Sequence, residues 1–165
     1  MNDRELIIKM ALDSWKGQIN AIDKVLGKLS DEQLMQEVSS MRNRGIYLLG
    51  HLTAVHDLML PLLRFEEANY PELQPIFIDA PDKAIVELPS ILQLRNQWKE
   101  VNAKLFDYYA SLTPAEWFTR HSNVSDGDFL KEPHRNRLNV LLGRVMHLSY
   151  HRGQLVLLTN RTLLC

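Results

Sequence analysis

The chain has 165 residues, of which 45% are hydrophobic, so it is long enough to form one domain with a substantial core. Its formal net charge of −1 provides no global positive field, which argues against nucleic acid or an anionic membrane surface as a partner. We therefore expect a single domain over residues 1–165, with no nucleic-acid partner and no membrane partner.

The composition also indicates a cellular compartment. The single cysteine, Cys165, is the last residue, so no intrachain disulfide can form. The first fifteen residues include charges from the third position onward and lack the long apolar segment of a secretion signal. No window approaches the run of about 18 apolar residues that a membrane-spanning helix needs. We therefore expect a cytoplasmic protein.

The first half of the chain predicts two long helices. Apolar residues recur at helical spacing over residues 3–29, and a capping-box sequence follows at Ser30–Gln33. A second periodic segment covers residues 43–67. The next stretch, residues 68–89, is predicted to be a long irregular crossover because four prolines interrupt it: Pro71, Pro75, Pro81 and Pro89.

The second half predicts two more long helices. The third is expected from about Pro89 to Ser111, and a short helix is expected to begin at Thr113. Residues 119–134 are predicted to form a polar loop, and residues 135–160 the last long helix. Four long helices without a convincing strand predict an all-α fold, a four-helix bundle with a long crossover between its second and third helices.

A weak internal repeat links the second and fourth helices. The segment from Arg42 to Gly50 matches the segment from Arg135 to Gly143 at six of nine positions. Chance identity among leucine and arginine residues explains these matches nearly as well. If the repeat is real, His51 and His147 lie near the same level of the bundle.

His147 and His151 are the most informative pair of residues. Four positions apart on a helix, they project from one face with Cβ atoms roughly 5–6 Å apart, and this spacing allows both to bind one metal ion. His151 falls inside the apolar stripe of its helix and His147 lies on the stripe's edge. A third ligand is expected from the second helix, where periodicity does not separate His51 from His56. The alternative is a pair of core histidines satisfied by hydrogen bonds.

Other polar residues have simpler interpretations. Asp57 is expected to be a surface charge, and His121 and His134 are expected to be exposed in the polar loop. Arg144 projects toward the apolar stripe one turn before His147. An anion-orienting role is one interpretation, and an ion pair with an acidic residue of a neighbouring helix is the one we favour. The three tryptophans are expected in the core or an interface: Trp15, Trp98 and Trp117.

The segment Met146–Leu155, taken with Gly50-His51-Leu52, resembles the DinB/YfiT-like superfamily of metal-dependent enzymes, and the resemblance spans nearly the whole chain. It implies a four-helix bundle that holds Zn²⁺ or Ni²⁺ with three histidines, and it selects His51 over His56, alongside His147 and His151. Many relatives carry another histidine where this chain has Tyr150, a position that points away from the expected site.

The resemblance further implies a homodimer that acts on a small-molecule substrate. Members of the family include transferases and isomerases that use a low-molecular-weight thiol, together with proteins described as hydrolases. We expect a metal-dependent transferase or hydrolase without an identifiable general base, because nothing in the spacing of Asp13, Asp57 or Tyr150 places them at the metal. The alternative is a non-catalytic bundle, with or without metal, that binds a small ligand or a protein.

Overall fold

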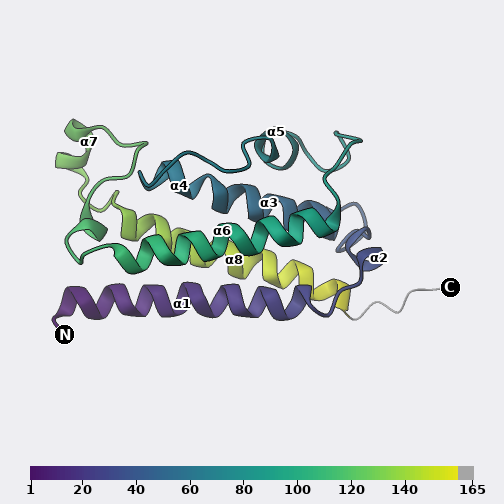
Figure 1. Cartoon of the computed structure of the whole chain (residues 1–165), viewed down its shortest axis with the longest axis horizontal. Helices are drawn as coiled ribbons and strands as arrows, with labels where there is room; N and C mark the ends of the chain where they lie inside the picture. Colours follow the sequence, from purple (N-terminus) through teal and green to yellow (C-terminus); the bar gives the residue numbers. More distant parts are fainter. Residues whose placement is uncertain (160–165) are drawn as a thin grey trace.

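The computed structural model describes residues 1–159, and every regular element in that range is a helix (Figure 1). The long helices are α1 (Asp3–Leu26), α3 (Gly45–Asp57), α6 (Ile91–Ser111) and α8 (Arg137–Thr159). The short ones are α2 (Asp31–Leu34), α4 (Met59–Leu62), α5 (Leu73–Phe77), the 3₁₀ helix η1 (Glu116–Phe118) and α7 (Asp126–Lys131). The predicted all-α class is confirmed.

Capping boxes start α1, α2 and α6, and the sequence predicted the one at Ser30. The Ser30 side chain accepts a hydrogen bond from the backbone N–H of Gln33, and the Gln33 side chain accepts one from the N–H of Ser30. Ser90 and Gln93 repeat this arrangement at the start of α6. Each reciprocal pair satisfies N–H groups that have no partner inside the helix, which explains why α6 begins two residues after the expected Pro89.

The long helices form two pairs. α1 packs along α8, and α3 packs along α6, with α3 also contacting α8. In Figure 1, α1 and α8 run in one direction, whereas α3 and α6 run in the opposite direction. Apolar side chains from all four helices form one buried cluster, which includes the three tryptophans expected there: Trp15, Trp98 and Trp117. The α3–α8 contact therefore lies between antiparallel helices.

The second helix is interrupted, contrary to the single helix predicted over residues 43–67. α3 ends at Asp57, and α4 is a separate short helix. Pro61 has no N–H to donate to the carbonyl of Asp57, so the hydrogen-bond ladder is broken there. Arg64 has a φ of 62°, a left-handed conformation that ends the segment.

The crossover between α4 and α6 is present but contains a helix, α5, that the prolines did not predict. α5 packs on α3, and the ring of Phe77 occupies the space where a Cβ at Gly50 would lie, 2.4 Å from its Cε1. Similarly, the polar loop predicted over residues 119–134 contains α7, which Ser125 caps. The crossover thus reaches α3 one residue before His51.

The last six residues of the chain, including Cys165 and the predicted final residue of the fourth helix, lie outside the described residues. Within residues 1–159, no helix is both long enough and apolar enough to cross a membrane.

Candidate metal centre

Three histidines converge between α3 and α8. Nε2 of His147 lies 3.1 Å from Nε2 of His51 and 3.0 Å from Nε2 of His151. One ligand atom from each residue lies within 4.8 Å of the other two. His151 is buried, and the other two rings are partly buried. The structure therefore brings together the three residues that the sequence and the family resemblance selected, with His51 and His147 at one level as the internal repeat predicted.

Hydrogen bonds orient two of the three rings. His51 donates through Nδ1–H to the carbonyl oxygen of Phe77 over 2.8 Å, and His151 donates through Nδ1–H to Oε1 of Gln154 over 2.7 Å. A neutral imidazole that is protonated at Nδ1 has its lone pair on Nε2. In both residues Nε2 is therefore the free ligand atom, and it faces the other imidazoles.

The surroundings of the cluster keep the rings neutral. Burial lowers the pKa of His51 and His151. Burial, together with repulsion from His151 and His51 in their protonated forms and from Arg144, lowers the pKa of His147 to about 3. Neutral imidazole is the form that coordinates metals. At neutral pH the three rings are thus already in their ligand form.

The spacing of the ligand atoms suits a divalent metal. Two nitrogens about 2.0–2.1 Å from a tetrahedral ion lie about 3.3 Å apart. The observed Nε2–Nε2 distances of 3.0 and 3.1 Å are close to this value. Three lone pairs that converge at such distances repel one another unless a proton or a cation lies between them. The donor set, its tautomers and its spacing all fit a three-histidine metal site.

His56 does not join this cluster, although periodicity alone left it equal to His51. Its side chain is fully buried, and Nδ1–H donates to Oδ1 of Asn102 over 2.7 Å. Burial lowers its pKa to about 4. Both histidines flank the apolar face of α3, but only the flank that carries His51 faces the two histidines of α8.

Asp57 is not a surface charge, so that prediction was wrong. Its side chain is buried, with Oδ1 accepting hydrogen bonds from the backbone and side-chain N–H groups of Asn69 and Oδ2 accepting one from the backbone N–H of Tyr70. A carboxylate that accepts several N–H donors can be buried without an ion pair. Asp57 thereby anchors the start of the crossover to the end of α3.

Arg144 does not form the ion pair that we favoured. Within residues 1–159 its guanidinium has no acidic partner, and its Nε is buried without a hydrogen bond. His134 is exposed as expected, whereas His121 is only partly exposed, and neither lies in the three-histidine cluster. Tyr150 is exposed, in agreement with the prediction that it points away from the site.

Two residues that hold the cluster were missed from the sequence. Gln154 follows His151 by three positions, a spacing that could have indicated a contact on one helix face. The carbonyl of Phe77 carries no sequence signal, because any residue at that point of the crossover supplies the same oxygen.

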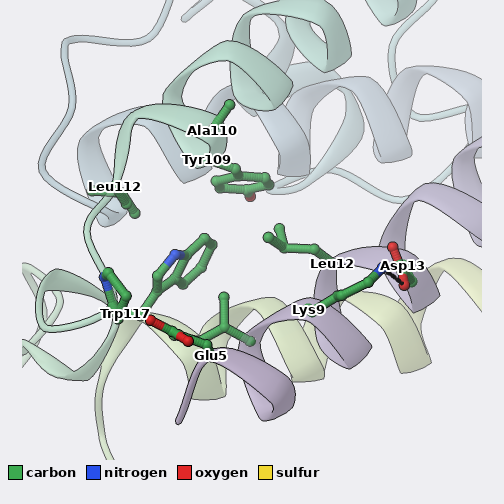
Figure 2. Close-up of a pocket in the computed structure, with 10 residues that line it drawn as sticks. Glu5, Lys9, Leu12, Asp13, Tyr109, Ala110, Leu112 and Trp117 are labelled. Carbon is green, nitrogen blue, oxygen red and sulfur yellow. Dashed lines mark hydrogen bonds and ion pairs between the residues drawn. The ribbon is translucent and has the colours of Figure 1, made fainter. Parts of the chain in front are cut away.

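A cavity of about 290 Å³ lies elsewhere, between the first half of α1 and the end of α6. Figure 2 shows Tyr109 and Trp117 on one side of it, opposite residues of α1. The charged groups on α1 have partners, since Lys9 pairs with Asp13 at 2.6 Å and Glu5 belongs to the α1 capping box. None of the three clustered histidines lines this cavity, so we assign the chemistry to the cluster.

Fold and cluster together define an all-helical protein with three convergent imidazoles between two antiparallel helices. The model of the DinB superfamily matches residues 14–155, and the chain belongs to that superfamily. The matched range contains all three histidines and confirms the resemblance. Comparison with functionally curated proteins finds no match.

Proposed function

We propose that the protein is a cytoplasmic, single-domain metal-dependent enzyme in which His51, His147 and His151 hold Zn²⁺ or Ni²⁺ through Nε2. The observation that carries this proposal is the convergence of three Nε2 atoms, two of them with their Nδ1–H groups committed to oxygen acceptors. Three protein ligands leave a coordination position open, which is typical of catalytic rather than structural zinc.

The proposed substrate is a small molecule, and the proposed reaction is a thiol-dependent transfer or a hydrolysis. When bound, a divalent ion supplies a Lewis acid that lowers the pKa of a coordinated thiol or water. The residues of the chain hold the ring orientations, because the Phe77 carbonyl and the Gln154 side chain each fix one Nδ1–H. No carboxylate belongs to the cluster within residues 1–159, so the three imidazoles are its only proposed protein ligands.

Metal content tests the site directly. Protein purified without a metal-affinity tag is expected to contain about one Zn²⁺ or Ni²⁺ per chain by elemental analysis, and His147→Ala is expected to lose it. His134→Ala is the matched control, because His134 is exposed and lies outside the cluster. Substoichiometric metal in the wild type, or full occupancy in His147→Ala, contradicts the proposal.

Chelation separates a metal-dependent protein from a metal-free bundle that only binds ligands. A metal present at 100 times its dissociation constant adds about 2.7 kcal/mol to the free energy of unfolding. For a chain of this length, that corresponds to a fall in Tm of roughly 5–10 °C when the metal is removed with EDTA. An unchanged Tm supports the metal-free alternative. If the Tm falls, turnover assays with thiols and electrophiles distinguish an enzyme from a metal-stabilised scaffold.

We further propose a homodimer formed through α8. Apolar side chains recur on its exposed face at helical spacing: Leu142, Met146, Tyr150 and Leu157. An exposed apolar stripe of this kind is typical of protein interfaces. Light scattering is expected to give twice the chain mass, and Met146→Glu is expected to give the monomer mass. Leu130→Glu, at an exposed apolar residue of α7, is the control that leaves the dimer intact.

A further inference from the structure

Arg144 of α8 is a partly buried cation without a partner. It precedes His147 by three residues, so the two side chains share a helix face. Its Nε is sealed from solvent and unpaired, and within residues 1–159 no acidic group contacts the guanidinium. Arg44, which is also partly buried, forms a salt bridge with Asp82 at 2.7 Å. Arg137, another partly buried arginine, also has a buried Nε without a hydrogen bond, but its guanidinium lies over the ring of Phe65, 5.4 Å from the centroid.

Arg144 and His56 lie on the same side of the three-histidine cluster. α3 and α8 are antiparallel (Figure 1), so His56 lies beyond His51 in the direction in which Arg144 lies beyond His147. Electrostatics agree, because burial together with the positive charge of Arg144 lowers the pKa of His51, His56 and His147. At 1.5 Å per residue, Arg144 is displaced from His147 by about 4.5 Å along the helix.

Other polar atoms at this place are also incompletely satisfied. Nε2 of His56 is buried without a partner in the described part of the chain. The hydroxyl of Tyr109 is buried, and within residues 1–159 its only hydrogen bond is a weak one to Sδ of Met59 at 3.9 Å. Met59 follows His56 by three residues, so this hydroxyl lies about one helical turn beyond His56. The guanidinium and this hydroxyl are thus two hydrogen-bond donors without a strong acceptor.

Charge and shape indicate the group that these donors bind. An unpaired charge removed from water is costly, and a guanidinium fork matches the two oxygens of a carboxylate. One carboxylate balances the single charge of Arg144, whereas a phosphate dianion leaves one charge in excess. Arg144 is only partly buried, and Nε is its only side-chain nitrogen that is both sealed from solvent and unpaired within residues 1–159.

We infer that Arg144 binds the carboxylate of a small substrate whose other end reaches the three-histidine site. This inference rests on the proposed function, and it adds the substrate class, a short carboxylic acid. The axial offset of about 4.5 Å between the two backbone positions favours a short substrate.

Paired thiols test the inference in the Co²⁺-loaded protein. 3-Mercaptopropionate and propane-1-thiol have similar length but differ in the carboxylate, and each is titrated through the sulfur-to-cobalt absorption band. The wild type is expected to bind 3-mercaptopropionate at least tenfold more tightly. Arg144→Gln is expected to lose this preference while keeping its affinity for propane-1-thiol, and Arg144→Lys to keep part of it. Arg152→Gln is the control on the same helix.

The outcomes separate this inference from the metal proposal. Equal affinities of the wild type for the two thiols, or a preference that persists in Arg144→Gln, overturn the inference while the metal site stands. If the protein binds no metal, the NMR signal of the Arg144 Nε–H, assigned by its loss in Arg144→Gln, is followed during titration of metal-free protein with propionate. A saturable shift supports a carboxylate site, and an unchanged signal overturns it.

Discussion

Gly50 is the residue whose replacement best tests how the crossover supports the site. A Cβ at this position would lie 2.4 Å from Cε1 and 2.5 Å from Cδ1 and Cζ of Phe77, whose side chain is fully buried. Ordinary carbon contacts are about 3.5–4.0 Å, so the ring must move by about 1 Å within a packed core. Gly50→Ala is therefore a test of close packing.

The expected magnitude follows from two opposing effects. Overpacking of a core typically costs about 1–3 kcal/mol, and we expect the upper end because the displaced group is a rigid ring. Replacing glycine by alanine inside a helix raises the free energy of unfolding by about 1 kcal/mol. We therefore expect Gly50→Ala to lower the free energy of unfolding by about 2 kcal/mol. Because the Phe77 carbonyl orients His51, metal affinity should also fall, by about tenfold or more.

Gly143→Ala is the matched control. Gly143 lies inside α8, and a Cβ there meets no atom within 4 Å. Gly143→Ala should therefore raise the free energy of unfolding by about 0.5–1 kcal/mol, because alanine favours the helix more than glycine does. Urea unfolding of the metal-free proteins, followed by circular dichroism at a constant m value, measures both changes. The reasoning is refuted if Gly50→Ala is as stable as Gly143→Ala.

Three further predictions concern buried polar groups. Burial lowers the pKa of His56 from 6.5 in the unfolded chain to about 4 in the folded one, so below pH 6.5 the unfolded chain binds a proton that the folded chain excludes. The free energy of unfolding should therefore fall by about 3 kcal/mol between neutral pH and pH 4. Urea unfolding curves of His56→Gln should lack this contribution. Asp57→Ala should lower the free energy of unfolding by about 2–3 kcal/mol in urea titrations, because the buried N–H of Tyr70 loses its acceptor, and a change below 0.5 kcal/mol would contradict this role. Gln154→Ala should weaken metal binding about 10–100-fold in competition with a chelating dye, since His151 loses the acceptor of its Nδ1–H; unchanged affinity would argue against that hydrogen bond.

Local features of the fold were predictable because they depend on neighbours in the chain. The predicted capping box at Ser30 needs only residues three positions apart, and the one at Ser90, which was not predicted, follows the same rule. The same holds for His147 and His151, which one helix places on one face whatever surrounds it. The break after Asp57 was missed, although Pro61 carried the signal, because apolar periodicity continues across it.

Contacts between elements were decided by tertiary structure. Periodicity places His51 and His56 on opposite flanks of the same stripe, and only the rotation of α3 against α8 determines which of them faces the other histidines. The burial of Asp57 and the unpaired state of Arg144 depend likewise on which chain segments reach them. Sequence thus determined the four long helices in outline and the pair His147 and His151, because capping hydrogen bonds and helical spacing act within one segment. The third imidazole, the Phe77 carbonyl and the Arg144 environment follow from how separate segments pack.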